Sequence, residues 1–323
     1  MLPIFLLFLL SAGCSSRSSP DRPVRMAIGG QSQLVYLPAT LAEQLHIYEK
    51  EGVRVALTDF QGGSKALEAL LGGSADVVCG FFDHVIQMQA EGRRLKAFVT
   101  IQRFPGLALL VSPATKRTIR SVADLKGAVV GVSAPGSSTD LYLKYILSRN
   151  GVDPAAVSVT GVGMSAASVA AMERGKVDAA VMAEPAITIL SKRAGNLTTL
   201  FDTRTEEGVQ AAFGTRQYPA AVLYSTEEWI ARNPDTVARL ARAMRRTLAF
   251  IQTSPQDVAR AMPTAFQADD PALYAETVRK ALPMYSTDGL MPPDGPAAVR
   301  RVLSVSLEKV RAATLDLRAS YVD

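Results

Sequence analysis

The chain has 323 residues, of which 48% are hydrophobic and 20% charged, and its formal net charge is +5. Because one hydrophobic core usually stops growing at roughly 250–300 residues, two domains are expected. Two cysteines and two histidines are too few for a cysteine–histidine zinc cluster, an iron–sulfur site or a disulfide scaffold. The basic residues form no long run, so nucleic acid is not an expected partner. Neither a metal nor a cofactor is expected.

Residues 1–14 are predicted to be an export signal that ends in a lipidation site. Met1–Leu10 is an uncharged apolar run, shorter than the roughly 20 residues that a membrane-spanning helix needs. The small residues before Cys14 resemble the lipobox of bacterial lipoproteins, although Ser11 stands where an aliphatic residue is commoner and no Lys or Arg precedes the run. Residues 15–23 are predicted to form a flexible tether. The protein is therefore expected in the periplasm or another extracytoplasmic space, anchored through a lipid on Cys14; the alternative is an apolar N-terminus without a targeting role.

From residue 24 onward, short β-rich runs alternate with segments whose apolar residues recur at helical spacing. Strands are predicted over Val24–Ile28, Val53–Phe60, Ala75–Gly80, Leu95–Ile101, Val129–Ser133, Ser158–Val162, Ala179–Ala183 and Ala220–Tyr224. Helices are predicted over Leu34–Leu45, Lys65–Leu71, Phe82–Glu91, Thr139–Arg149, Ala166–Arg174 and Ala186–Arg193. Beyond the last strand, the chain is predicted to be almost wholly helical. This alternation favours an α/β fold with mostly parallel sheets.

One internal repeat indicates that the α/β units form two lobes. The segment from Ser64 to Asp76 and the segment from Ser165 to Asp178 share one order: a serine, a helical run, a glycine, an aspartate and an apolar strand. The serines are expected to cap the N-termini of their helices. Two similar units about a hundred residues apart predict two lobes rather than one long sheet.

Four loops rich in glycine and serine follow predicted strands, namely residues 29–32, 61–64, 133–139 and 161–165. Ligands of open α/β sheets bind beyond the carboxyl ends of the strands, where glycine permits a close backbone approach and helix starts favour negative charge. Ser137 and Asp140 also match a capping box, which would aim amides into the loop. One such loop alone could be merely a helix cap. Four of them, from both halves of the chain, favour a binding cleft.

Other candidate residues follow the ends of the strands. Phe81 and Phe82 could form the wall of a pocket or belong to the core, and Asp83 could cap a helix or accept from a ligand donor. Glu184 could be a charge in the first turn of a helix or an acceptor in the cleft. Cys79 lies in an apolar run and is expected to be a small buried residue.

Several function classes lack their motifs. The sequence has neither a P-loop nor a Gly-x-Gly-x-x-Gly segment that opens a helix after the first strand, so a nucleotide cofactor is not expected. Asp83 and His84 form no catalytic triad without a nucleophile, and no Gly-x-Ser-x-Gly elbow occurs. The chain is therefore not expected to be an enzyme.

Residues 121–127 (SVADLKG), 129–132 (VVGV) and 135–138 (PGSS) together resemble periplasmic substrate-binding proteins of ABC importers. The resemblance is to the nitrate/sulfonate/taurine group, which includes binders of pyrimidine thiamine precursors, and it extends over residues 24–200. Supporting motifs are residues 60–64 (FQGGS), 71–76 (LGGSAD), 175–178 (GKVD) and 184–185 (EP). The resemblance implies a type II two-lobe clamshell, in which each lobe is a mixed, mostly parallel sheet flanked by helices. Lobe one would be residues 24–107 plus 201–323, and lobe two residues 108–200.

The same resemblance implies a ligand site between the lobes. Its residues would be Gln31, Tyr36, Gln61, Gly62, Gly63, Ser64, Phe81, Phe82, Asp83, Ser133, Ser137, Ser138, Thr139, Met164 and Glu184. The closed form would deliver a small sulfonate, taurine, nitrate or a related polar organic solute to membrane permease subunits. The alternatives are a pyrimidine thiamine-precursor binder, an enzyme of thiamine-precursor synthesis, or a sensor module on the same fold. The loops contain no Arg or Lys, so a zwitterion or a planar heteroaromatic base fits as well as a bare anion.

Overall fold

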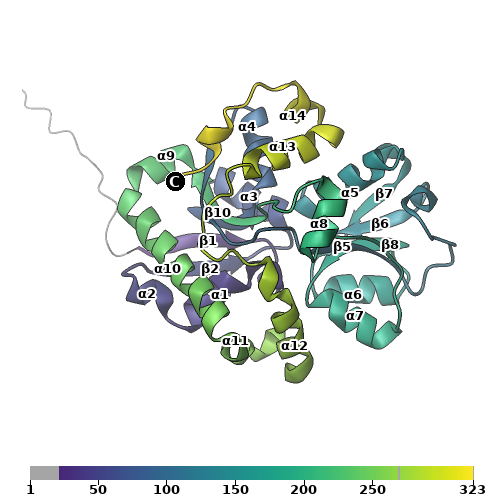
Figure 1. Ribbon diagram of the computed structural model, residues 1–323, viewed down its shortest axis with the longest axis horizontal. Coiled ribbons are helices and arrows are strands. Elements are labelled where there is room, and N and C mark those ends of the chain that lie inside the picture. Colours follow the sequence, from purple (N-terminus) through teal and green to yellow (C-terminus); the bar gives the residue numbers. More distant parts are fainter. Residues whose placement is uncertain (1–21, 268–269, 323) are drawn as a thin grey trace, which may run out of the picture.

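A computed structural model describes residues 22–267 and 270–322. Cys14 and the rest of the predicted signal and lipidation site lie outside the described residues. The strands form two five-stranded sheets, each flanked by helices on both faces (Figure 1). Within the described ranges, no helix is long and apolar enough to cross a membrane.

The first sheet has the strand order β2-β1-β3-β10-β4. Its strands are β1 (Val24–Ile28), β2 (Val55–Asp59), β3 (Val77–Phe81), β4 (Leu95–Thr100) and β10 (Ala221–Thr226). Strand β1 pairs in parallel with β2 and β3, whereas β10 pairs antiparallel with β3 and β4, so β10 alone runs against the others. Between these strands lie α1 (Leu37–Gln44), α2 (Ile47–Lys50), α3 (Gly63–Leu71) and α4 (Asp83–Ala90).

The second sheet repeats this arrangement, with the strand order β7-β6-β8-β5-β9. Its strands are β5 (Leu107–Val111), β6 (Val129–Val132), β7 (Ser158–Gly161), β8 (Ala179–Ala183) and β9 (Thr199–Asp202). Its helices are α5 (Ser138–Arg149), α6 (Ala166–Glu173) and α7 (Ala186–Ala194). The reversed strand is again fourth in the order, because β5 pairs antiparallel with both β8 and β9. Each crossover between the sheets therefore delivers the chain into the reversed strand of the next sheet.

The C-terminal part returns to the first sheet and is helical after β10, as predicted. Its helices are α8 (Glu206–Phe213), which precedes β10, then α9 (Glu227–Arg232), α10 (Pro234–Thr253), α11 (Pro255–Ala261), α12 (Pro271–Ala281), α13 (Gly295–Ser306) and α14 (Glu308–Ala312). Helix α10 packs with α1 and α2, whereas α13 and α14 pack on α4 (Figure 1). Helix α13 also packs on α5, so the C-terminal part contacts both lobes.

The predicted strands are confirmed, with ends shifted by no more than two residues. Two strands were not predicted: β5 is a continuous apolar run that periodicity cannot assign, and β9 is a four-residue strand at the sheet edge. One expectation about helix caps is wrong, because Ser64 lies inside α3 and the N-cap position belongs to Gly62. Ser165 does occupy the N-cap position of α6, but its side chain makes no capping hydrogen bond.

The aspartates of the internal repeat have equivalent positions in the two sheets. The carboxylate of Asp76 accepts the backbone N–H of Arg25 at 2.9 Å, which joins the start of β3 to β1. The carboxylate of Asp178 accepts the backbone N–H of Val129, also at 2.9 Å, which joins the start of β8 to β6. Asp76 is further held by the Arg25 guanidinium, at 3.0 and 2.7 Å. Each aspartate therefore fixes the register of two neighbouring parallel strands.

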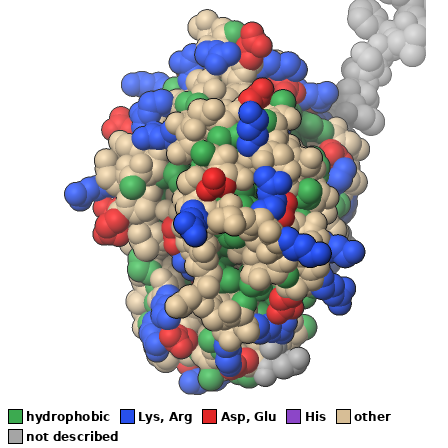
Figure 2. Space-filling view, turned by 90° about the vertical axis from the view of Figure 1, so that its right-hand side faces the viewer, with side chains coloured by type: hydrophobic (Ala, Val, Ile, Leu, Met, Phe, Trp, Pro, Cys, Tyr) green, Lys and Arg blue, Asp and Glu red, His purple; other side chains and the backbone are tan. Residues whose placement is uncertain are grey.

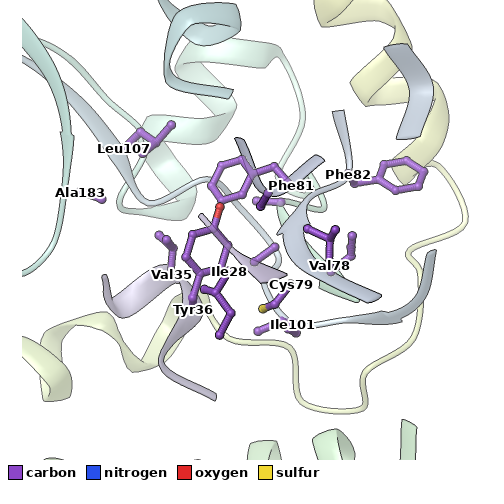
Figure 3. Packing of buried hydrophobic residues seen from close by; sticks show 14 of the residues in the cluster. Ile28, Val35, Tyr36, Val78, Cys79, Phe81, Phe82, Ile101, Leu107 and Ala183 are labelled. Atoms are coloured by element: carbon purple, nitrogen blue, oxygen red, sulfur yellow. The ribbon is translucent and has the colours of Figure 1, made fainter. Parts of the chain in front are cut away.

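The hydrophobic core extends through both lobes. One cluster joins the first sheet to the α5 side of the second sheet, and a smaller cluster fills the other face of the second sheet, under α6 and α7. Figure 3 shows Leu107 of β5 and Ala183 of β8 near the first-lobe residues Val35 and Tyr36. Over the end of the molecule that the second sheet forms, Lys and Arg side chains are interspersed with Asp and Glu (Figure 2).

Replacing Asp76 or Asp178 by alanine is expected to lower the free energy of unfolding by about 2–3 kcal/mol, because each change leaves a strand N–H without its charged acceptor. Urea denaturation measures the effect. Asp257→Ala is the control, since it removes an exposed ion pair with Arg260 and should leave stability nearly unchanged. Equal losses of stability in Asp76→Ala, Asp178→Ala and Asp257→Ala would contradict this role of the two aspartates.

The effect of Asp76 is also expected to depend on pH. Burial of its carboxyl opposes ionisation, but the hydrogen bonds and charge of Arg25 outweigh burial and lower the pKa of Asp76. An acid with a lowered pKa stabilises the fold above its unfolded-state pKa, and this contribution is lost as pH falls through the lowered value. The stability difference between the parent and Asp76→Ala should therefore shrink in acid.

Candidate functional site

The carboxyl ends of strands from both sheets face one another, and their loops meet across a cleft. The hydroxyl of Ser137 accepts the backbone N–H of Ser64 at 3.0 Å, and the two hydroxyls are 3.1 Å apart. The Ser64 hydroxyl also lies 3.1 Å from the carbonyl oxygen of Pro135, to which it donates. These contacts join the loop after β2 to the loop after β6.

This approach depends on the absence of a side chain at Gly62. A Cβ built there would lie 2.9 Å from the Ser137 hydroxyl oxygen and 3.1 Å from that of Ser133, and φ is +145°. Side chains rarely adopt that φ, and real Cβ atoms essentially never lie within 3.0 Å of another heavy atom. The glycine predicted from the loop pattern is therefore required by the contact between the lobes.

A second set of contacts links the start of α4 to the start of α5. Ser138 donates its hydroxyl hydrogen to the Oδ1 of Asp83, with an oxygen–oxygen distance of 2.8 Å. The Nε2 of His84 lies 3.3 Å from the carbonyl oxygen of Gly136. Asp83 and His84 are both buried. A carboxylate that the sequence placed at a strand end is thus enclosed between the two lobes.

A third set of contacts lies at the other side of the cleft. The hydroxyl of Ser165 bonds the hydroxyl of Ser32 and accepts from the side-chain amide of Gln33. The backbone N–H of Leu34 donates to the carbonyl of Glu184 at 2.9 Å. Ser165 has φ of 55°, an uncommon conformation for a residue other than glycine. The lobes are therefore in direct contact at this side of the cleft as well.

Two small adjoining cavities lie within this cleft, with volumes of about 20 and 10 Å³. They share Phe81, Leu107 and Ser138. The first is otherwise lined by Gly29, Val35, Tyr36, Gly63, Ser133, Ser137, Thr139 and Met164, and the second by Asp83, Pro105, Leu141, Tyr142, Phe213, Tyr218, Val302 and Leu303. One chamber is thus rich in hydroxyl groups, and the other is aromatic and contains the buried carboxylate.

The structure separates the predicted site residues into three groups. Those that line the two cavities are Tyr36, Gly63, Phe81, Asp83, Ser133, Ser137, Ser138, Thr139 and Met164. Others lie at the contact between the lobes: Gly62 and Ser64, together with Gln61, which is exposed and lies beside Gly163. The side chains of the remaining three, Gln31, Phe82 and Glu184, point elsewhere, although the backbone carbonyl of Glu184 accepts from Leu34 across the cleft.

Each of these three has another partner or position. The side-chain amide of Gln31 donates to the hydroxyl of Thr40 at 3.1 Å. The ring of Phe82 is fully buried and points away from Tyr36 (Figure 3). The carboxylate of Glu184 pairs with the Arg204 guanidinium at 2.8 Å, and its other oxygen accepts from the start of α7. Of the two acidic candidates, only Asp83 lines one of the cleft cavities described above.

Two further sequence expectations have distinct outcomes. The capping box at the start of α5 is wrong: Ser137 makes no capping hydrogen bond, and Asp140 accepts instead from the backbone of Gly136 at 2.8 Å. Aromatic residues of the second chamber, such as Tyr142, Phe213 and Tyr218, were not predicted, because they come from a helix interior and from the second crossover, where no local motif marks them.

The electrostatics of the cleft are set by burial. Burial raises the pKa of Asp83, and the charge of His84 and the hydrogen bond from Ser138 offset part of that rise. Burial likewise raises the pKa of Tyr36, whose ring packs edge-on against Phe81 with centroids 6.0 Å apart. Among the described residues that line the two cavities, none is Lys or Arg.

Solved structures with this fold include binding proteins of two kinds. The alkanesulfonate-binding protein SsuA from Xanthomonas axonopodis pv. citri, bound to MOPS, is 19% identical, with a TM-score of 0.69 over 92% of this chain and 94% of that one. The periplasmic nitrate-binding protein NrtA from Synechocystis PCC 6803 is 12% identical, with a TM-score of 0.66 over 92% and 84%. This chain therefore has the type II fold of periplasmic binding proteins.

A structure from Bordetella bronchiseptica RB50 is more similar in sequence, at 35% identity, with a TM-score of 0.88 over 94% of this chain and 95% of that one. The family model described as NMT1/THI5 like matches residues 34–258. The chain belongs to the NMT1/THI5-like family. No curated protein sequence matches it.

Gly62→Ala is expected to hold the lobes apart, because the added methyl group would overlap the Ser137 and Ser133 hydroxyls. Small-angle scattering should then give a larger radius of gyration than for the parent. Gly73→Ala is the matched control: its φ is +73°, so the backbone cost is similar in kind, but no atom lies within 4 Å of the added carbon. An unchanged radius for Gly62→Ala would contradict the close contact.

Proposed function

We propose that the chain is the extracytoplasmic solute-binding component of an ABC importer and that a small solute binds between its lobes. The observation that carries the proposal is the lining of the two cleft cavities, which takes Tyr36 and Phe81 from the segments around the first sheet and Leu107 and Ser138 from those around the second. A solute that contacts both lobes stabilises the closed arrangement relative to an open one, so binding shifts the hinge toward closure. The closed form then docks on the permease subunits.

The hinge is assigned to the two crossovers, residues 101–106 and 203–220, which join the sheets. The domain limits expected from the sequence, 24–107 plus 201–323 and 108–200, fall within two residues of the ends of these crossovers. A volume of about 20 Å³ is close to the space of a single water. A larger solute therefore requires the lobes to separate around it, and rotation about the crossovers provides that room.

Asp83 determines which solutes fit. A buried carboxylate is costly unless donors surround it, and the hydroxyl of Ser138 supplies one. A solute with an N–H group would supply another. Because the cavities have no Lys or Arg in their lining, a bare anion would meet Asp83 without a compensating side-chain cation. We therefore favour a solute with an N–H group over nitrate or a simple alkyl sulfonate.

Two solute types meet this requirement. An aminosulfonate of the taurine type would place its ammonium group at Asp83 and its sulfonate at the start of α5, where the helix dipole favours negative charge. A planar aminopyrimidine, as in a thiamine precursor, would place its amino group at Asp83 and its ring against Phe81 and Tyr36. The aromatic chamber favours the second type, and the hydroxyl chamber accommodates either.

A thermal-shift panel of taurine, alkyl and aromatic sulfonates, nitrate, bicarbonate and aminopyrimidines is expected to show stabilisation by taurine or an aminopyrimidine, the members with an N–H group. Asp83→Asn should weaken that binding about tenfold or more, since it removes a charge-assisted hydrogen bond. Phe81→Leu should weaken an aminopyrimidine more than taurine. Asp153→Asn, an exposed change in lobe two, is the control.

The same binding should depend on pH. A carboxyl with a raised pKa becomes ionised only as pH rises through that value, so affinity for an amine-bearing solute should rise with pH in the parent and stay flat in Asp83→Asn. Stabilisation by none of the panel would contradict the solute-binding proposal. Chemical consumption of a bound compound would show an enzyme instead of a carrier.

Lipidation of Cys14 remains part of the proposal. In a bacterial host with lipoprotein processing, the full chain is expected to incorporate radiolabelled palmitate and to fractionate with membranes, and Cys14→Ala should lose both properties. Cys79→Ala is the control, because Cys79 is fully buried in β3. Label in Cys14→Ala, or none in the parent, would disprove the anchor.

A further inference from the structure

A cavity much larger than those of the cleft lies outside it. Its volume is about 570 Å³, which falls in the range of small-molecule sites, whereas the cleft cavities measure about 20 and 10 Å³. It is lined by Arg22, Pro23, Val24, Gly52, Val53, Arg54, Asp76, Trp229, Asn233, Asp235, Thr236 and Arg239. These residues surround the amino ends of β1 and β3, whereas the cleft lies at the carboxyl ends of these strands.

One arginine of this cavity is held in place by the backbone. Arg239 of α10 donates from Nη1 to the carbonyl of Gly52 at 2.7 Å. A Cβ built at Gly52 would lie 2.4 Å from that nitrogen, and φ there is +72°. Only glycine therefore leaves room for the guanidinium in this position. Arg239 also lines the cavity.

Among the described residues of the lining, arginines outnumber aspartates. Arg22, Arg54 and Arg239 contribute three guanidinium groups, against the carboxylates of Asp76 and Asp235. Asp76 is already paired with the guanidinium of Arg25, which approaches within 2.7 Å. Arg22 lies 3.6 Å from Asp76, with 60% of its side chain exposed, so this pair is loose. The Trp229 indole adds an apolar wall to the same space.

We propose that this cavity is a second binding site, separate from the cleft, which takes a phosphate group attached to an organic residue. Guanidinium groups match phosphate oxygens in geometry and charge, and several can share one phosphate. The indole provides a surface for the attached organic part, and the volume exceeds what a phosphate alone requires. The phosphate can belong to a soluble ester or to a phospholipid headgroup.

Trp229 makes the site directly observable, because it is the only tryptophan of the chain. Titration of the full chain with sn-glycerol 3-phosphate is expected to change the tryptophan emission saturably. Arg239→Glu should weaken this response about tenfold or more, and Asp235→Asn should strengthen it, since a repelling carboxylate is removed. Gly52→Ala should also weaken it by displacing the Arg239 guanidinium.

Arg245→Glu is the matched control. Arg245 is exposed on the same helix but lines a different cavity, beside Gly289. The Arg245→Glu variant has the same change in net charge as Arg239→Glu. An equal loss of the fluorescence response in both variants would therefore indicate a general charge effect and overturn the site. Thermal unfolding of each variant shows whether the fold is retained, and Arg239→Lys provides a milder change at the same position.

A vesicle arm separates the two sources of phosphate. The full chain is mixed with phosphatidylcholine vesicles with or without 20 mol% phosphatidylglycerol, and the ratio of the two bound fractions is measured, so that the contribution of the apolar run at residues 1–10 cancels. A ratio that falls in Arg239→Glu but not in Arg245→Glu identifies a headgroup site. If the soluble ester binds and the ratio of the two vesicle-bound fractions is one, the ligand is a soluble ester. A response in neither arm would overturn the proposal.

Discussion

The closeness of the two lobes at Gly62 is the constraint on which the cleft depends. Because no side chain stands there, the start of α3 lies against the loop that opens α5, and Ser64 can bond both Ser137 and Pro135. That contact closes one side of the cleft and brings Asp83 to the hydroxyl of Ser138. A larger residue at position 62 would weaken all of these contacts together, since Pro135, Ser137 and Ser138 all lie at the start of α5.

The orientation of these loops follows from the repeated topology. In each sheet, an aspartate fixes the two neighbouring parallel strands, Asp76 for β1 and β3 and Asp178 for β6 and β8. Each crossover then enters the reversed strand, which lies beside β3 or β8. With this arrangement in both sheets, the carboxyl ends of the parallel strands face each other. The cleft is thus a consequence of two similar units joined twice, and it needs no long insertion.

The sequence predicted what local chemistry determines. Alternating runs located most strands, and the Gly–Ser loops located the residues that meet across the cleft. It could not predict what depends on packing. Phe81 and Phe82 are chemically alike and adjacent, yet Phe81 ends β3 and packs against Tyr36, whereas Phe82 already has helical backbone angles and its buried ring points away from Tyr36. Glu184 matched the motif of a cleft residue, but Arg204, twenty residues later in the chain, pairs with its carboxylate.

The distribution of charge separates two kinds of ligand. In the cleft, a buried carboxylate without a cation in the surrounding cavity lining favours a donor-bearing solute, whereas the outer cavity presents Arg22, Arg54 and Arg239 and favours an anion. Stabilisation of the protein by an anion therefore does not by itself show that the anion binds in the cleft. Trp229 lines the outer cavity, and Asp83 lines the cleft. Binding that changes tryptophan emission but tolerates loss of the Asp83 charge belongs to the outer site, and the reverse pattern belongs to the transported solute.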